Sequence, residues 1–388
     1  MRKQIKLMTK ENYKEVFKLS QFAFQYTLDK DQLAEKEAEA GRHKIWGWIE
    51  NNQLAAKVHM IPLTVHINEQ DMKMGGIASV SSWPEFRRGG IVKKLLKHTL
   101  LNMREEGYII SYLHPFSVPF YRKYGYELVF NYRDYEIPIK QFQKNWNALG
   151  HVKRIEADYN ILESIYIDYI KSFNGGIIRD TDWWKQRVVK KEMVIAVGYD
   201  QDNKPDSYIL YHVKDRVLYV EEIAYRSLNS LKLVLEFIGN HDSMVEKVKM
   251  KVPDEDFIPC LFDEPRFEQI VKKYFMARIV DVPEFLKNYQ FISIHSSDSI
   301  SLIIEDEFIP DNNGTYIIQD EKVTCLDHEL TDTRNVICCS VQQLTQMLLG
   351  YKRPLELERL ALIKGSYNAI EKFDKMIPIK HTYFPDFF

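Results

Sequence analysis

The stretch that decides the fold runs from Ala78 to Tyr126 and reads ASVSSWPEFRRGGIVKKLLKHTLLNMREEGYIISYLHPFSVPFYRKYGY. Its pattern is typical of a strand, a glycine-rich turn, a helix, a second strand and an aromatic loop. Residues 78–82 are small or β-branched, and Pro84 cannot donate to a sheet ladder, so the strand ends near Trp83. From Ile91 to Met103 the apolar residues recur every 3.6 positions, which predicts a helix directly after the glycines.

The turn between this strand and helix predicts a binding site for a pyrophosphate. Its residues are Arg87, Arg88, Gly89, Gly90 and Ile91. Glycine lets backbone N–H groups approach a ligand closely, and the first turn of a helix has unpaired N–H groups and a partial positive charge. The guanidinium groups of the two arginines can form paired hydrogen bonds with phosphate oxygens. A diphosphate is therefore the ligand that this turn fits.

Length and composition narrow the class of protein. The chain has 388 residues, which predicts two or three domains, and its formal net charge of -2 lacks the basic excess of a nucleic-acid binder. No targeting segment is visible, and no apolar run approaches the roughly 20 residues of a membrane span. The cysteines show neither disulfide nor metal-binding spacing, so we expect a cytoplasmic protein without a metal. They are Cys260, Cys325, Cys338 and Cys339.

The order of predicted elements indicates α/β and α+β architecture in three domains, at residues 1–140, 150–280 and 281–388. The second domain repeats the strand, helix and strand of the first. Where the first has its turn, however, the second has Tyr225–Ser230, which contains no glycine. We interpret the second domain as a degenerate copy without a cofactor site, and an independent α/β fold of similar order is the alternative.

Four finer expectations concern individual strands. In the first domain, Tyr108–Leu113 would lie parallel to Ala78–Ser82, because a helical crossover of this length forms a right-handed βαβ unit. Glu127–Ile137 would then complete the first sheet. Later in the chain, Met276–Val282 would open the last domain and Gln290–His295 would form one of its strands.

The chain ends on two aromatic residues, Phe387 and Phe388, whereas most termini are polar and frayed. Burying both side chains would contribute several kcal/mol, at about 1.5–3 kcal/mol each. Burial would also bring the terminal carboxylate into the interior, where a charged group needs a partner or a function.

Two motifs in the opening stretch resemble the GCN5-related N-acetyltransferases (GNAT). Arg87 and Gly90 match the acetyl-coenzyme A signature R-x-x-G-x-[G/A], although Val92 stands where a small residue is usual. Phe120–Tyr126 matches F-Y-x-[KR]-[FY]-G-[FY], the loop that carries the acid in this superfamily. Two such domains followed by a sterol-carrier-like domain that ends on phenylalanine are similar, along the whole chain, to the Eis family (enhanced intracellular survival) of bacterial N-acetyltransferases.

This resemblance implies tandem GNAT domains, a sterol carrier protein-like domain and acetyl-CoA as co-substrate. It also implies that Tyr121 is the general acid and that the carboxylate of Phe388 is the general base. Gly89 replaces a third arginine of the family, which leaves less charge for the phosphates. Because the family forms symmetric oligomers, often hexamers, a homo-oligomer is implied as well. The residues that would hold acetyl-CoA are Val80, Ser81, Ser82, Arg87, Arg88, Gly89, Gly90 and Ile91.

Acetyl transfer from a thioester to an amine poses two proton-transfer problems. The ammonium must lose a proton before it attacks, and the thiolate departs more readily when it is protonated. An α-carboxylate with a pKa of about 3.5 and a tyrosine with a pKa of about 10 suit these tasks. We expect a strand N–H near Ser82 to polarise the carbonyl. His114 is the second candidate for the base, and Tyr124 and Tyr126 would pack beside the site or flank it.

The acceptor is expected in an aromatic cavity formed by Phe24, Tyr26 and Trp83 together with the C-terminus. Aromatic walls with a carboxylate suit a cationic amine, and the resemblance implies aminoglycosides, polyamines or lysines. Two alternatives remain at this point. The first is a ligand-binding protein that uses the C-terminal groove and has a vestigial CoA site. The second is an acetyltransferase that acts on lysines or protein N-termini.

Overall fold

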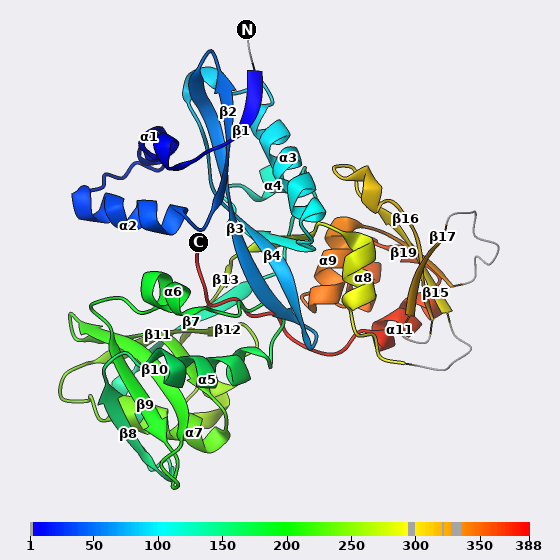
Figure 1. The fold of residues 1–388 in the computed structure, drawn as a ribbon. Helices are drawn as coiled ribbons and strands as arrows, with labels where there is room; N and C mark the ends of the chain where they lie inside the picture. Colours follow the sequence, from blue (N-terminus) through cyan, green and yellow to red (C-terminus); the bar gives the residue numbers. More distant parts are fainter. Residues whose placement is uncertain (1–2, 294–298, 320–321, 327–334) are drawn as a thin grey trace. The chain divides into compact units, whose positions relative to one another are not determined.

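A computed structural model describes residues 3–293, 299–319, 322–326 and 335–388, which form two compact units (Figure 1). The first unit comprises Met1–Val129, Phe275–Ile379 and Phe388, and the second comprises Phe130–Tyr274 and Lys380–Phe387. Each unit therefore contains segments that are distant in the sequence. None of the described helices is both long and apolar enough to cross a bilayer.

The first unit contains a sheet of seven described strands in the order β1-β2-β3-β4-β5-β14-β6. Helices α1 and α2 lie on one side of the long β3–β4 ribbon, and α3 lies on the other (Figure 1). The strands are β1 (Lys3–Leu7), β2 (Lys44–Glu50), β3 (Gln53–Ile67), β4 (Gln70–Ser82), β5 (Ile110–Leu113), β6 (Glu127–Leu128) and β14 (Met276–Ile279). The helices are α1 (Tyr13–Phe24), α2 (Lys30–Ala40), α3 (Ile91–Glu105) and α4 (Val118–Arg122).

The strands β4 and β5 are parallel, as predicted, but they pair earlier along β4 than expected. Met74–Ile77 pairs with Ile110–Leu113, so Ala78–Ser82 extends beyond the last paired residue. The physical reason is that β5 has only 4 residues and ends at Leu113, before the aromatic loop. Beyond Ile77, the edge of β4 that faced β5 therefore has no strand beside it in the described part of the chain.

Two strand assignments made from the sequence are wrong. Glu127–Ile137 does not complete the first sheet, because only β6 belongs to it and β7 (Asn131–Pro138) pairs with two strands of the second unit. Met276–Val282 does not open the last domain, because β14 pairs with both β5 and β6. An alternating apolar pattern specifies which side chains of a strand are buried, but it does not specify which sheet the strand joins.

Arg278, on β14, is fully buried and has acceptors at all three of its nitrogens. The guanidinium forms an ion pair with Asp306, which is also fully buried, and donates to the backbone carbonyl of Tyr124 in the aromatic loop. Its Nε donates to the carbonyl of the next residue at 3.2 Å. Gly125 lies directly against it, since a Cβ at that position would come 2.7 Å from Nη1. The arginine thus joins the aromatic loop, the sheet and the last segment of the first unit.

That last segment is an α+β layer with five described strands in the order β17-β16-β15-β18-β19. It packs on the sheet through α9, where the Ile279 N–H donates to Thr345 Oγ1 at 3.2 Å. The expected strand Gln290–His295 is wrong for residues 290–293, which are irregular, and its remainder lies outside the described residues. The elements are α8 (Val282–Asn288), β15 (Ser299–Glu305), β16 (Gly314–Gln319), β17 (Lys322–Leu326), β18 (Val336–Ser340), α9 (Val341–Leu349), α10 (Pro354–Arg359), β19 (Lys364–Gly365) and α11 (Tyr367–Met376).

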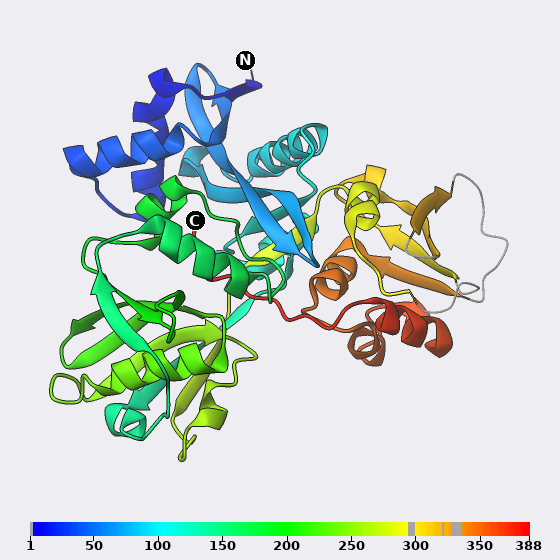
Figure 2. The ribbon, with the colours of Figure 1, turned by 60° about the horizontal axis from the view of Figure 1, so that its bottom comes forward.

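The second unit has its own sheet of seven described strands, in the order β13-β7-β12-β11-β10-β9-β8. Figure 2 shows α5 and α7 on opposite faces of this sheet, and each helix covers a separate apolar core. Strands β11 and β12 are parallel and are joined by α7, which repeats the β4–α3–β5 arrangement. The remaining elements are β8 (His151–Ile155), α5 (Tyr159–Ile170), α6 (Thr181–Trp183), β9 (Val194–Tyr199), β10 (Pro205–Lys214), β11 (Val217–Tyr225), α7 (Leu228–Gly239), β12 (Lys247–Pro253) and β13 (Glu268–Lys273).

The buried pair of Arg278 and Asp306 yields the first prediction. We expect Arg278→Met to lower the free energy of unfolding by about 3–5 kcal/mol, because it leaves a buried carboxylate without its counter-charge. Urea denaturation followed by circular dichroism measures this change. The control is Lys352→Met, which removes an exposed ion pair with Glu356 and should cost less than about 1 kcal/mol. Equal effects of the two substitutions would contradict the structural role of Arg278.

Candidate active site

Strand β4 contains a bulge just beyond its last residue paired with β5. Ser79 has a φ of 51°, which is the left-handed region, and the pairing of β3 with β4 shifts register here. A bulge leaves backbone groups of the strand unpaired and aims them away from the ladder. On the edge that faced β5, no described strand pairs with the expected cofactor-binding residues Val80, Ser81 and Ser82, and the Ser82 carbonyl accepts from Arg87 Nη2 at 3.3 Å.

A buried lysine on β3 holds this bulge in place. Lys57 is fully buried, and its Nζ donates to Ser79 Oγ at 2.7 Å and to the Ser79 carbonyl at 3.0 Å. It also lies 3.1 Å from Nε2 of His59. No carboxylate of the described chain forms an ion pair with it, and burial lowers the pKa of Lys57 to about 7. An amine that is about half protonated near pH 7 is therefore fixed behind the bulge.

The polar cluster continues from the bulge toward α1. Ser20, on α1, lies 3.3 Å from Ser79, with both hydroxyls facing each other. Burial raises the pKa of Tyr26, and a hydrogen bond with Ser20 opposes this shift. The expected acceptor-binding residue Tyr26 is thus connected to the bulge of β4 through two serines.

The turn after β4 is open, as a ligand site requires. Arg87, Arg88, Gly89 and Gly90 are all exposed, and a Cβ built on Gly90 would have no atom within 4 Å. Arg88 and Gly90 have φ values of 66° and 73°, so the backbone turns sharply here. The first intrahelical bond of α3 joins the Lys94 N–H to the Gly90 carbonyl, which leaves the N–H groups of the preceding helical residues without a helical partner. The geometry fits a diphosphate.

The corresponding turn of the second unit is closed by its own side chains. The N-terminus of α7 is capped by Ser227, whose Oγ accepts from the Ser230 N–H at 3.1 Å. The same hydroxyl donates to the carboxylate of Asp206 at 3.0 Å. A capped helix end beside a negative charge is unsuited to a phosphate. This contrast agrees with our interpretation that only the first copy has a cofactor site.

Tyr121 lies on the short helix α4 in the aromatic loop. Its ring is buried in the core shared with α3, and Phe116 and Phe120 contact it edge-on. Burial raises the pKa of Tyr121 above its usual value, with smaller contributions from Tyr126 and Tyr124. Tyr121 is 3% exposed. Its position is compatible with the expected acid.

The neighbouring tyrosines of the loop have structural contacts. Tyr126 is fully buried, and its hydroxyl lies 2.7 Å from that of Ser111, which donates to the Gly75 carbonyl. Burial raises the pKa of Tyr126 to about 12. The ring of Tyr124 packs on Phe308 with a centroid distance of 4.9 Å. Both rings therefore hold the loop against the core.

The terminal residue Phe388 is buried on the opposite face of the sheet from α3. A Cβ on Gly76 would come within 2.8 Å of its ring, whereas a Cβ on Gly75 would meet Met103 of α3. The ring also contacts Phe275 edge-on at 5.0 Å. Gly76 immediately precedes Ile77, the last residue of β4 that pairs with β5. Phe387, in contrast, is exposed, so only the last aromatic residue is buried.

The three expected acceptor residues lie at the end of α1 and the end of β4. Phe24 is the last residue of α1, and Tyr26 follows it outside the helix, after Gln25 in the left-handed region. Both side chains are exposed. Trp83 follows the end of β4 and lies on Phe22 with a ring centroid distance of 4.7 Å. The structure thus brings Trp83 against α1, as expected. His114 is exposed and contacts Phe275.

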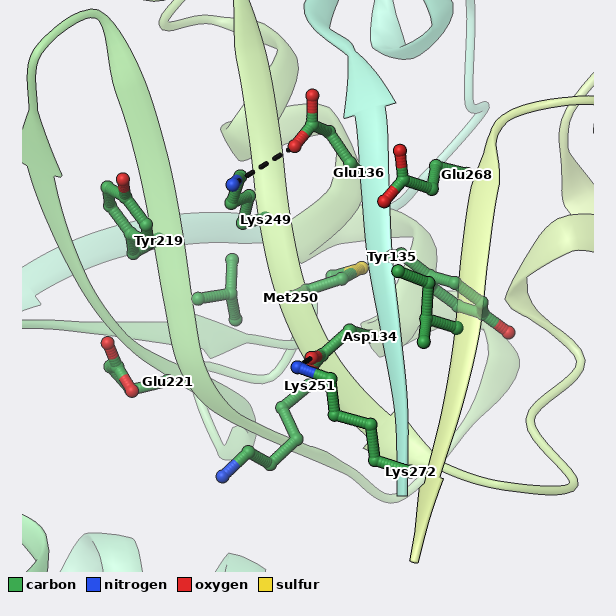
Figure 3. A pocket seen from close by; sticks show the side chains of 12 residues that line it. Asp134, Tyr135, Glu136, Tyr219, Glu221, Lys249, Met250, Lys251, Glu268 and Lys272 are labelled. Atoms are coloured by element: carbon green, nitrogen blue, oxygen red, sulfur yellow. Dashed lines mark ion pairs between the residues drawn. The ribbon is translucent and has the colours of Figure 1, made fainter. Parts of the chain in front are cut away.

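A hollow on the second unit lies on a charged face of its sheet (Figure 3). Ion pairs cross the strands there, from Lys249 to Glu136 at 3.1 Å and from Lys272 to Asp134 at 2.6 Å. An exposed sheet face with alternating charges is an ordinary solvated surface. Among the described residues, no group of histidine, cysteine, aspartate or glutamate side chains is arranged to hold a metal.

Sequence reasoning missed two positions that shape the site. Lys57 stands in the apolar strand sequence LAAKVHM. A charged residue in a strand that is buried on both faces is costly, so this lysine could have been singled out from the sequence. Gly75-Gly76 is a glycine pair within a strand, which often marks a close approach of another group. In this structure that group is the ring of Phe388.

Comparison with protein families agrees with this arrangement of sheets and turns. Residues 4–129 and residues 175–279 each match an acetyltransferase (GNAT) domain, and residues 282–385 match the sterol carrier protein domain. The chain is a GNAT acetyltransferase. Its two GNAT domains and its sterol carrier domain occur in the order expected from the sequence, which confirms the predicted fold class. GNAT domains use acetyl-CoA as co-substrate.

Solved structures share the fold of this GNAT acetyltransferase along its entire length. A probable N-acyltransferase from Enterococcus faecalis V583 has 27% identity and a TM-score of 0.93, and each chain is covered to 100%. A GCN5-related N-acetyltransferase from Anabaena variabilis ATCC 29413 (20% identity, TM-score 0.86) and Eis1 from Mycobacterium abscessus (17% identity, TM-score 0.83) also match with 100% of each chain covered. A comparison with curated proteins gave no match.

Burial of Lys57 leads to a prediction about pH. Its pKa is about 7 in the folded protein and about 10.5 in the unfolded chain, so the unfolded chain binds more protons between these values. Folding stability should therefore rise with pH from about 7 to 10. We expect the free energy of unfolding of the wild type to gain about 2 kcal/mol relative to Lys57→Met between pH 7 and pH 9. Urea titrations at both pH values measure this, and parallel pH profiles would contradict it.

The open turn predicts where acetyl-CoA affinity originates. Arg88→Ala should weaken acetyl-CoA binding by about 10- to 100-fold, because a charge-assisted hydrogen bond contributes about 1.5–3 kcal/mol. The matched control is Arg226→Ala in the corresponding turn of the second unit, where the guanidinium already bonds Asp168. Isothermal titration calorimetry should give one site per chain and an unchanged affinity for the control. Equal losses in both variants would overturn the assignment.

Proposed function

We propose that this chain transfers the acetyl group of acetyl-CoA directly to a primary amine of a cationic small molecule of the aminoglycoside or polyamine class. In this proposal Tyr121 is the general acid and the carboxylate of Phe388 is the general base. The observation that carries the proposal is the burial of Phe388 on Gly76, beside the point where β4 and β5 part. A chain end buried in the sheet of a GNAT domain needs a functional reason.

In this proposal the acid and the base reach the point where β4 and β5 part from opposite faces of the sheet. This arrangement suits direct transfer of the acetyl group. Tyr121 belongs to the core on the α3 face of the sheet. Helix α3 begins directly after the turn that we expect to bind the diphosphate. Phe388 packs on the other face. A thioester between the parting ends of β4 and β5 would then present its sulfur toward the tyrosine. Its carbonyl carbon would face an amine on the face of α1. Holding both reactants in this way accounts for much of the rate gain in such reactions.

The proton steps balance with these two groups alone. The carboxylate of Phe388 accepts a proton from the ammonium, and the neutral nitrogen attacks the thioester carbon. The C–S bond breaks as Tyr121 donates its proton to the sulfur, and the second proton that the acylated nitrogen must lose then returns to the tyrosine. Because burial raises the pKa of Tyr121, its hydroxyl is protonated throughout the neutral range and is ready to donate.

The bulge supplies a donor for the developing oxyanion, and we place it at Val80 rather than near Ser82. Lys57 donates to the carbonyl of Ser79, and a trans peptide directs the following N–H, that of Val80, the opposite way. A hydrogen bond to the carbonyl polarises the peptide and strengthens its N–H as a donor. Lys57 would therefore act on the thioester through the peptide that it holds.

A cationic acceptor fits the charge and the aromatic side chains beside α1. The helix α2, sequence KDQLAEKEAEA, contains four acidic and two basic side chains. Phe22 and Phe24 are about half exposed at the nearby end of α1, at 50% and 51%. Aromatic faces and acidic groups attract organic ammonium ions. An amine with several charges is favoured over a neutral one.

The test of the chemistry is Tyr121→Phe. We expect kcat to fall by about 100-fold or more, because general acid catalysis contributes about 10²–10⁴. The acetyl-CoA dissociation constant should remain within about twofold, since the hydroxyl lies outside the phosphate turn. Tyr124→Phe removes a hydroxyl from the same loop and is the matched control. Release of free CoA thiol during steady-state turnover is the measurement.

The same assay separates the alternative functions. A panel of aminoglycosides, polyamines, lysine peptides and protein N-termini identifies the acceptor class. A ligand-binding protein with a vestigial CoA site would release no thiol with any amine. A wild-type rate that Tyr121→Phe leaves unchanged would remove the tyrosine from the mechanism.

We also propose that the protein is a cytoplasmic homo-oligomer. The support is the resemblance to a family of symmetric, often hexameric enzymes, together with the cysteine pattern of a reduced compartment. Light scattering coupled to size-exclusion chromatography gives the number of subunits directly.

A further inference from the structure

The strand β13 forms one edge of the second sheet. Its sequence is EQIVKK, it pairs with β7, and no strand of the described chain lies on its other side. In an antiparallel ladder alternate residues bond to one neighbour, so half of the N–H and C=O groups of β13 face away from β7. All six residues are exposed, including Ile270 at 44% and Val271 at 47%. An exposed edge with an apolar centre is suited to pairing with another strand.

The charges of β13 are poorly balanced within a single chain. Glu268 lies directly opposite Glu136 of β7, and like charges in such a pair are destabilising. Glu136 already forms an ion pair with Lys249 at 3.1 Å. Lys272, near the other end of β13, pairs with Asp134 at 2.6 Å. Glu268 would therefore gain from a cation placed on the outer side of the strand.

A second copy of β13 supplies that cation when two such strands pair about a two-fold axis. An axis perpendicular to the sheet passes between two identical residues and keeps the same face of both strands on one side. Centred on Ile270, it places Glu268 opposite the partner subunit's Lys272, and Lys272 opposite the partner subunit's Glu268. The two Ile270 side chains then meet between the two charge pairs. All three residues lie on one face of β13, where they line the hollow on the second unit (Figure 3).

The neighbouring registers lack this match. Centred on Val271, the axis would place Lys272 opposite Ile270, and centred on Gln269 it would place Glu268 opposite Ile270. Centred on Lys272, it would bring two like charges together. Charged side chains on an edge strand normally prevent pairing, and here they disfavour these three registers while permitting the one about Ile270.

We infer that β13 is a contact between two copies of this chain, paired antiparallel about Ile270 so that their second sheets form one continuous sheet. The inference rests on the proposed homo-oligomer and names one of its interfaces. Backbone hydrogen bonds and the contact between the two Ile270 side chains provide the attraction, and the two pairs of Glu268 with Lys272 fix the register. A contact of this kind uses the same surface on both copies and closes after two.

Charge reversal at the edge tests this contact. Glu268→Lys removes the like charge opposite Glu136, so the melting temperature should stay the same or rise, but it places lysines opposite each other between the two copies. We expect association to weaken by about 10- to 100-fold in sedimentation equilibrium, because two opposite-charge pairs become like-charge pairs. Lys272→Glu should weaken association to a similar extent. The matched control is Glu221→Lys, which changes the charge of the same hollow on β11, away from the edge.

A mixture of the two variants separates a specific contact from a general effect of charge. Chains with Glu268→Lys have lysine at both positions 268 and 272, and chains with Lys272→Glu have glutamate at both. A mixed pair therefore has opposite charges at both contacts, and equimolar mixing should restore association to within about threefold of the wild type. Two weakened variants that do not associate with each other would overturn the inference.

The remaining outcomes distinguish this contact from the proposed homo-oligomer. If the wild type is an oligomer and neither Glu268→Lys nor Lys272→Glu weakens it, the contact is overturned and the homo-oligomer stands. If the wild type is a monomer at every concentration, both fail. An equal loss in the Glu221→Lys control would show a general charge effect and overturn the contact. Weakened single variants, a restored mixture and an unchanged control support both.

Discussion

The buried ion pair of Arg278 and Asp306 is the contact on which the first unit depends. Arg278 is on β14, a strand that reaches the first sheet only after the chain has completed the second one. Its guanidinium binds the aromatic loop at Tyr124 and the last segment at Asp306, so a single side chain connects three parts of the unit. Buried ion pairs add little net stability, but they penalise arrangements in which either partner is unpaired. The pair therefore favours this one arrangement of strand, loop and last segment.

The two GNAT copies illustrate how one topology serves two purposes. In both, a parallel pair of strands is joined by a helix, but the helix end of the first is open at Gly90 and that of the second is capped by Ser227. The second copy also binds residues 381–386 through Arg179 and Asn174. The two copies thus share one topology but differ in whether side chains cap the helix end.

The sequence predicted the fold class and the local elements of the first GNAT domain well, because both depend on short-range patterns. The glycine turn, the helix from Ile91 and the aromatic loop are encoded by neighbouring residues, and they appear where expected. The exchange of β7 and β14 between the sheets was not predictable, since strand pairing across more than a hundred residues leaves no periodic signal. Residues 276–279 even fall within the second GNAT match, although they complete the first sheet. The bulge at Ser79 was missed because it involves a side-chain contact with a lysine in the adjacent strand, 22 residues away, which no local pattern indicates.

Use of the chain terminus as a base has a physical rationale in the proposed reaction. An α-carboxylate has a lower pKa than the side chains of aspartate and glutamate, so it remains ionised at neutral pH even when partial burial raises its pKa. It is attached directly to the backbone without rotatable side-chain bonds, so its position varies less than that of a glutamate carboxylate. The ring of Phe388 then anchors the carboxylate on Gly76, where no side chain competes for the space.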